Sequence, residues 1–178
     1  MSRPGAKVEV LYSAAEIAER IRLLAAAIAA GMGPDLLVVA ILKGSFIFAA
    51  DLVRALHHAG LHPETDFKTL TSYGSGPESR GRVAINRDVT EGVAGRQVLL
   101  IDDILESGRT LAFARDALRA RGAEVRICVL LDKPGKRKTA LEADFTGFVC
   151  PDRFVVGYGL DYAHYYRELP YIGLVEGR

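Results

Sequence analysis

The residues with the clearest chemical potential lie in one stretch, 98–111, which reads Val-Leu-Leu-Ile-Asp-Asp-Ile-Leu-Glu-Ser-Gly-Arg-Thr-Leu. An apolar strand is expected to end in Asp102 and Asp103 and to pass through a small polar loop into a helix. Open parallel sheets bind ligands at this edge. The two acids suit sugar hydroxyls or a hydrated Mg²⁺. Hydroxyls, backbone N–H groups and the positive end of a helix suit a phosphate, and they come from Ser107, Gly108, Arg109 and Thr110.

A purely structural interpretation of this stretch also exists. In that interpretation Asp102 and Asp103 only end a strand, Glu106 favours the start of the helix, and Ser107 is its N-cap. Two adjacent ionised acids repel each other unless a cation is present. Capping does not explain why they follow an apolar strand and precede an anion-binding loop, so the pattern favours a functional site.

The elements around this stretch alternate between strand and helix. Ser13 and Glu16 form a capping-box pattern that opens a helix ending near Gly31. Apolar runs predict strands over 36–42, 97–102 and 125–131, and alternation predicts another over 66–73. Helical spacing follows two of these strands, first at Phe46, Ala49, Ala50, Val53 and Leu56, and then at Leu111, Ala114 and Leu118.

This order predicts an α/β fold with a mostly parallel central sheet flanked by helices, because strand–helix–strand units form right-handed parallel crossovers. We expect one domain over residues 1–178. Residues 74–81 have the composition of an exposed, mobile loop. The segment from Phe145 onward is rich in aromatic residues, and periodicity does not order its short strands.

Composition excludes several classes of partner. Lysine plus arginine number 23 against 22 acids, a net charge of +1, so we expect neither a nucleic-acid partner nor a membrane surface. The sequence contains no apolar leader and no uncharged run near the ~18 residues of a membrane span, which predicts a cytoplasmic protein. Cys128 and Cys150 lack redox or zinc spacing, and a buried thiol is expected at Cys128.

Residues 98–111 resemble the phosphoribosyl pyrophosphate signature of the type I phosphoribosyltransferases. Three further segments, 42–46, 131–134 and 154–162 with Arg167, resemble the hypoxanthine-guanine members of that family. The resemblance runs from about Val8 to Val175. It implies a Mg²⁺-dependent pentosyltransferase that moves the 5-phosphoribosyl group from phosphoribosyl pyrophosphate to hypoxanthine and/or guanine in purine salvage. It also implies a small hood, built from the terminal segments, that holds the purine.

The resemblance assigns phosphate and metal roles to individual residues. Lys43 and Gly44 correspond to a pyrophosphate-binding turn with a non-proline cis peptide before the lysine, and Arg167 to a pyrophosphate-binding arginine. Asp161 corresponds to an acid near the second Mg²⁺ and the base. From the residues alone, Lys43 could equally be a solvated lysine. Ser72 and Tyr73 correspond to the start of a loop that closes over the site.

The purine-binding roles fall on Lys133, Phe154 and Val155. Lys133 corresponds to the lysine that donates to the 6-oxo group, Phe154 to the aromatic that stacks on the base, and Val155 to a backbone contact with its edge. Phe154 could alternatively be a core aromatic. Arg137 could assist at the pyrophosphate or belong to a solvated basic turn. The histidines at 57, 58, 62 and 164 match no motif and are expected to be structural.

Glu106 departs from the family pattern, in which aspartate is the presumed general base toward the purine N7. The carboxylate is kept and its reach changes by one methylene, so we expect Glu106 to be catalytic and to open the 5'-phosphate loop. Ser107 and Asp102 replace the commoner threonine and glutamate with the same functional groups. Two other hypotheses stay open: a regulatory protein that senses phosphoribosyl pyrophosphate, and a xanthine- or pyrimidine-directed transferase. Relatives of this kind are dimers or tetramers, so a homo-oligomer is expected.

Overall fold

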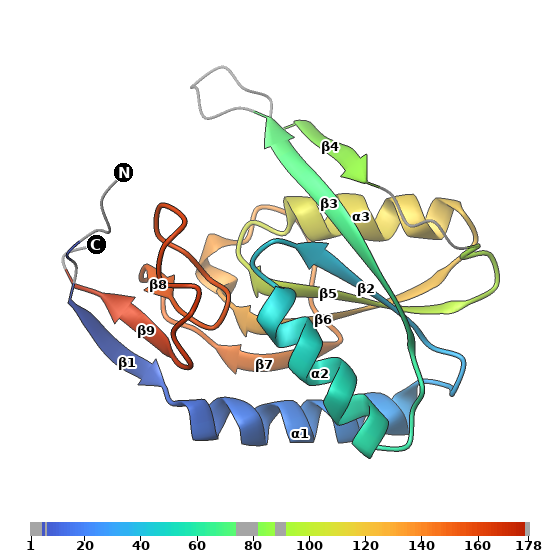
Figure 1. The fold of residues 1–178 in the computed structure, drawn as a ribbon. Coiled ribbons are helices and arrows are strands. Elements are labelled where there is room, and N and C mark those ends of the chain that lie inside the picture. The colour runs from blue at the N-terminus through green and yellow to red at the C-terminus, as the bar shows by residue number, and fades with distance from the viewer. Residues whose placement is uncertain (1–4, 6, 74–81, 88–91, 177–178) are drawn as a thin grey trace.

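The protein is represented by a computed structural model that describes residues 5, 7–73, 82–87 and 92–176. Its larger sheet has the strand order β4-β3-β2-β5-β6-β7 (Figure 1). Five of these strands run parallel, and β4 joins the edge antiparallel to β3. The strands are β2 (Leu37–Leu42), β3 (Glu64–Tyr73), β4 (Arg82–Arg87), β5 (Gln97–Leu105), β6 (Glu124–Asp132) and β7 (Phe145–Val149). The predicted α/β class and parallel sheet are confirmed.

Helices cover both faces of this sheet, as the continuous apolar strands require. On one face, α1 (Ala14–Gly31) and α2 (Phe46–His58) pack on Val38, Ala40 and Leu99. On the other, α3 (Arg109–Ala120) packs on Leu37, Val39 and Leu100, and Figure 1 shows it on the side opposite α1 and α2. Successive residues of one strand therefore belong to two separate cores, which fixes the register of the sheet.

The helix boundaries follow from local chemistry. The predicted capping box is present, since Ser13 Oγ accepts from the Glu16 N–H and Glu16 Oε2 accepts from the Ser13 N–H at 2.8 Å. Leu111, Ala114 and Leu118 form the buried face of α3, as predicted. For α2 the predicted helix is present, and Ala49 and Leu56 of the predicted spacing are buried. Its buried side chains are Phe48, Ala49, Leu52 and Leu56, while Phe46 is 44% exposed.

A second, three-stranded sheet forms the hood. It joins β1 (Val8–Tyr12), β9 (Ile172–Val175) and β8 (Val155–Val156), all antiparallel, and Figure 1 shows it beside β7 at one end of the molecule. Because β9 lies between β1 and β8, segments from the two ends of the chain support the short strand that follows Phe154. The predicted small hood beside the parallel sheet is confirmed as this antiparallel sheet.

Two further predictions can be compared with the structure. Cys128 is fully buried as expected, and Cys150 is also a buried free thiol. Among the described residues, no helix is both long and apolar enough to cross a membrane. The predicted mobile loop, 74–81, lies outside the described residues.

Candidate active site

Two adjoining cavities lie at the carboxyl edge of the parallel strands. The larger, about 850 Å³, reaches the hood and is lined by nine of the predicted site residues: Lys43, Gly44, Asp103, Glu106, Lys133, Phe154, Val155, Asp161 and Arg167. The smaller, about 240 Å³, is lined by six: Asp102, Asp103, Glu106, Ser107, Gly108 and Thr110. Asp103 and Glu106 line both cavities, so they stand where the two meet. Arg109 lines neither.

The smaller cavity lies at the N-terminus of α3. β5 ends at Leu105, and Gly108 is the N-cap of α3 with φ +78°, a left-handed conformation that favours glycine. A Cβ at Gly108 would lie 2.3 Å from Thr139 Oγ1, so a side chain has no room there. Ser107 Oγ accepts from the Arg109 N–H at 3.4 Å. Free N–H groups and the helix dipole make this turn suitable for a phosphate.

The acidic pair lies inside β5 rather than after it. Asp102 and Ile104 still pair with Val129 and Leu131 of β6, so the strand continues beyond the predicted end at Asp102. Parallel pairing with β6 holds the two carboxyls on a rigid element. Burial, followed by repulsion from Asp103, raises the pKa of Asp102 well above its ordinary value. Burial also raises the pKa of Asp103, and a hydrogen bond with the Asp102 side chain, hydrogen bonds with backbone N–H groups and the charge of Arg167 oppose this rise.

The Gly44 backbone packs closely against the Asp103 carboxylate. The Leu42–Lys43 peptide is cis, as the resemblance implied, and the turn brings the Gly44 backbone against the acid. A Cβ at Gly44 would lie 1.6 Å from Asp103 Oδ2, so any side chain would displace this carboxylate. Lys43 is exposed but lines the larger cavity, which favours its predicted phosphate role over a solvated lysine elsewhere.

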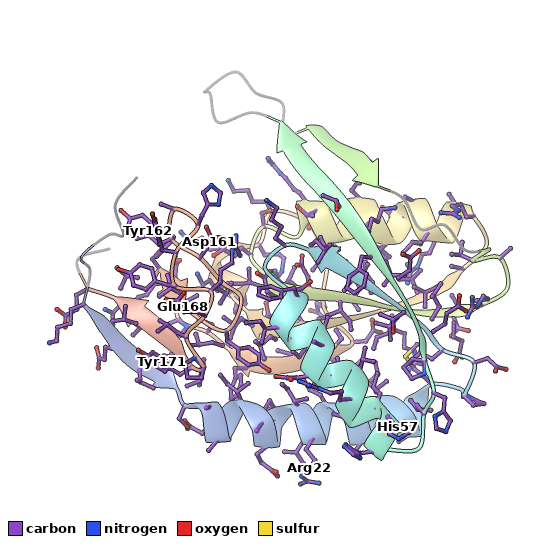
Figure 2. The ribbon with its side chains drawn as sticks, in the orientation of Figure 1. Arg22, His57, Asp161, Tyr162, Glu168 and Tyr171 are labelled. Carbon is purple, nitrogen blue, oxygen red and sulfur yellow. The ribbon has the colours of Figure 1, made fainter. Side chains whose placement is uncertain are left out.

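A compact loop between β8 and β9 brings the remaining charges to the cavity. Arg167 Nη2 lies 2.6 Å from Asp161 Oδ1, and Arg167 also donates to the Gly159 carbonyl. Gly159 has φ +99°, and a Cβ there would lie 2.2 Å from the Gly44 oxygen, so the loop packs directly on the Lys43–Gly44 turn. Figure 2 shows Asp161 and Tyr162 in this loop, far from His57 at the end of α2.

Lys133 and Glu106 form an ion pair in the larger cavity. Lys133 is only 5% exposed, and its Nζ donates to Glu106 Oε1 at 2.7 Å. Phe154 is 36% exposed at the cavity wall, so the alternative of a core aromatic is wrong. Its ring meets Tyr162 edge-on at 5.7 Å between centroids. Val155 is buried in β8 directly after it.

The sequence analysis missed some residues of the larger cavity. His164, expected to be structural, lines it, and its backbone N–H donates to Asp161 Oδ2 at 2.8 Å. Thr69 and Leu160 also contribute to the wall. Ala163, His164 and Tyr166 have positive φ, a backbone path for which their residue types give no signal. Ser72 and Tyr73 end β3, and the positions of their side chains lie outside what the structure describes.

The acids can be tested as a Mg²⁺ site through their donor set. Within the described part of the chain, no three histidine, cysteine or acidic side chains gather closely enough to hold a metal ion by themselves. Mg²⁺ usually keeps several waters and is held by one or two carboxylates together with substrate phosphates. The carboxyls of the adjacent residues Asp102 and Asp103, which line the smaller cavity, fit such a substrate-bridged ion.

Comparison with known proteins shows the family to which this chain belongs. The family model described as phosphoribosyl transferase domain matches residues 8–163, which include both cavities' walls as far as Asp161. A bifunctional protein TilS/HprT of Listeria innocua is 46% identical over 170 residues, covering 94% of this chain. The chain spans 26% of the length of that relative.

Two further relatives are of similar length to this chain. The hypoxanthine phosphoribosyltransferase of Escherichia coli is 45% identical over 172 residues, with 94% of this chain and 95% of that protein covered. A crystal structure of a hypoxanthine phosphoribosyltransferase from Staphylococcus aureus has TM-score 0.88 at 41% identity, covering 94% and 91% of the two chains. The chain therefore belongs to the hypoxanthine-guanine branch of the phosphoribosyltransferase family.

Proposed function

We propose that this chain transfers the 5-phosphoribosyl group from phosphoribosyl pyrophosphate to hypoxanthine or guanine, releasing IMP or GMP and pyrophosphate. The observation that carries the proposal is the Lys133–Glu106 pair, 2.7 Å apart where the two cavities meet. The carbonyl oxygen and N7 of a 6-oxopurine lie on one edge of the base. The ammonium can donate to the carbonyl while the carboxylate faces N7. Because an ammonium has no acceptor, the 6-amino group of adenine is a poor partner.

The adjoining cavities accommodate the two ends of the sugar substrate. Ser107, Gly108 and Thr110 would hold the 5'-phosphate, with Arg109 starting the helix behind them. At the other side of Asp103, the pyrophosphate would meet Lys43, Gly44 and Arg167. The anomeric carbon then lies between the acids and the purine, where pyrophosphate can leave as the base nitrogen arrives.

The acids of this site stabilise positive charge on the sugar. Displacement at the anomeric carbon passes through an oxocarbenium-like transition state, and the Asp102 and Asp103 carboxylates lie on the cavity side to oppose its charge. We propose that these two acids and Asp161 also hold Mg²⁺, which when bound neutralises the leaving pyrophosphate. Phe154 would stack on the purine, the Val155 backbone would meet its edge, and Glu106 would take the N7 proton.

An assay with five bases tests the proposal. Phosphoribosyl transfer is measured with hypoxanthine, guanine, xanthine, adenine and uracil, each with Mg²⁺ and again with excess chelator. We expect transfer to hypoxanthine or guanine, little to adenine, and none in chelator. Transfer only to xanthine or uracil would identify the other transferase, and binding of phosphoribosyl pyrophosphate without any transfer would identify a sensor.

Lys133→Met should weaken selection of the base and leave phosphoribosyl pyrophosphate binding nearly unchanged. A hydrogen bond to a charged group contributes about 1.5–3 kcal/mol, so the KM for hypoxanthine should rise about 10- to 100-fold. The preference for hypoxanthine over adenine should fall with it, because the discriminating donor is gone. Steady-state kinetics with both bases check this. An unchanged preference would remove Lys133 from the purine site.

We also propose that the protein acts in the cytoplasm as a homo-oligomer, a dimer or a tetramer, without nucleic-acid or membrane partners. The near-neutral balance of 23 basic and 22 acidic residues supports the absence of polyanionic partners. Light scattering on the purified protein measures the number of subunits, and a monomer at working concentration would contradict the proposal.

A further inference from the structure

A short segment, residues 137–139, binds carbonyl groups at and just before the phosphate loop. Arg137 Nη1 donates to the carbonyl oxygens of Leu105 at 3.1 Å and Glu106 at 2.7 Å. The next carbonyl, that of Ser107, accepts from the Lys138 N–H at 3.0 Å and from Thr139 Oγ1 at 3.2 Å. Residues 137–139 therefore bind three successive carbonyls at the end of β5 and in the loop, and the Leu105 carbonyl also accepts from the Lys133 N–H at 2.9 Å.

Arg137 itself is held in place and does not line the substrate cavities. Its side chain is 17% exposed, and its Nη2 forms an ion pair with Asp132, the last residue of β6. Neither of the roles suggested by the sequence fits: the guanidinium is not at the predicted pyrophosphate position, and it is not a solvated basic side chain.

These contacts determine where the N–H groups of the loop point. In a trans peptide the C=O and N–H groups point in opposite directions. Binding the carbonyls of Leu105, Glu106 and Ser107 therefore directs the next N–H groups, those of Glu106, Ser107 and Gly108, away from the Arg137 segment. Ser107 and Gly108 line the smaller cavity. Convergent N–H groups of this kind form an anion site.

We infer that Arg137 is a positioning residue, which fixes the phosphate loop so that its N–H groups meet the 5'-phosphate. The inference rests on the proposed function, since it assigns that phosphate to the smaller cavity. Thr139 assists by holding the Ser107 carbonyl and by leaving room only for glycine at position 108. A lysine at 137 could not serve two carbonyls and Asp132 with the same planar geometry.

The test compares a ligand with and without the phosphate. Dissociation constants of IMP and inosine are measured by calorimetry without pyrophosphate for the wild type, Arg137→Met and Arg137→Lys. Lys136→Met is the matched control, because Lys136 pairs with Asp152 at 3.1 Å with both side chains about half exposed. We expect the ratio of the inosine constant to the IMP constant to fall roughly tenfold in Arg137→Met. It should fall less in Arg137→Lys and stay unchanged in Lys136→Met.

The ratio separates positioning from a merely structural role. If Arg137 only stabilised the fold, Arg137→Met would lower the melting temperature and weaken both ligands equally, leaving the ratio unchanged, and the inference would be overturned. If Arg137→Met does not fold, Thr139→Val, which removes one donor to the Ser107 carbonyl, should lower the ratio a few-fold, and an unchanged ratio there would overturn it as well. A wild type that binds IMP no better than inosine would refute the proposed function itself.

Discussion

Replacing both Asp102 and Asp103 with asparagine should lower kcat for phosphoribosyl transfer by at least about 10²- to 10³-fold, the size of effect seen when one fixed electrostatic contact to a transition state is lost. Asparagine keeps the shape of each side chain and loses its charge. The variant then opposes the positive charge of the sugar less well and offers Mg²⁺ neutral oxygens only. Steady-state kinetics over a range of Mg²⁺ concentrations measure the effect.

The same double variant should keep or gain thermal stability at neutral pH. Burial raises the pKa of both carboxyls above the ordinary value of 3.8, so ionising them in the folded, metal-free protein is unfavourable. Stability from such acids is fully present below pH 3.8 and is lost as the pH rises toward the folded-state pKa. The asparagines do not ionise, so the advantage of the variant should shrink on acidification.

Asp116→Asn is the matched control for charge removal. Asp116 lies in α3, and its side chain is 63% exposed beside Arg115, away from both cavities. This variant should leave kcat and the melting temperature nearly unchanged. Near-normal transfer by the Asp102→Asn, Asp103→Asn protein would refute the roles given to the acidic pair.

Glu106→Gln should lower kcat by about 10²- to 10⁴-fold, the usual loss when a general base is removed. The amide keeps the length of the side chain, and its oxygen can still accept from Lys133 Nζ, which donates to Glu106 Oε1 at 2.7 Å in the wild type. Purine binding and folding should therefore change little, while the acceptor for the N7 proton is lost. Measuring kcat and the melting temperature on one preparation distinguishes these effects.

Glu106→Asp provides the second arm of this experiment. Aspartate keeps the carboxylate and shortens the side chain by one methylene, so activity should fall much less than in Glu106→Gln. If Glu106 served only the dipole of α3, Glu106→Gln would lower stability by roughly 0.3–1 kcal/mol and leave kcat intact. That pattern would assign N7 deprotonation to solvent or to a purine that binds already deprotonated.

Sequence reasoning recovered the parts of the fold that depend on local pattern. Three strands of the parallel sheet, β2, β5 and β6, contain the predicted apolar runs, and the edge where they end carries the acids and the phosphate loop in one contiguous stretch. The exposure of Phe46 was not predictable. Phe46 is an apolar residue of a type common in protein cores. It lies in the first turn of α2, near the exposed Lys43, and is 44% exposed.

The contacts that complete the site could not be predicted from local sequence pattern, because they join residues that are far apart in the chain. Glu106 and Lys133 are 27 residues apart, and their pairing depends on the parallel register of β5 and β6. Arg137 donates to the carbonyls of Leu105 and Glu106, but it lies in a turn whose basic sequence is typical of solvent-exposed side chains. The hood required the pairing of Val8 with Val175, which no spacing in the sequence indicates.

The position of β9 in the hood has a consequence for how the protein is made. Chains emerge from the ribosome from the N-terminus at about 5–20 residues per second. The parallel sheet and the phosphate loop are complete once Val149 has emerged, but β8, which follows Phe154, pairs with β9. A nascent chain that ends before Ile172–Val175 can therefore form the loop proposed to hold the 5'-phosphate while Phe154 and Val155 still lack the strand that supports them. During synthesis, the contacts proposed for Phe154 and Val155 with the purine should be the last part of the site to form.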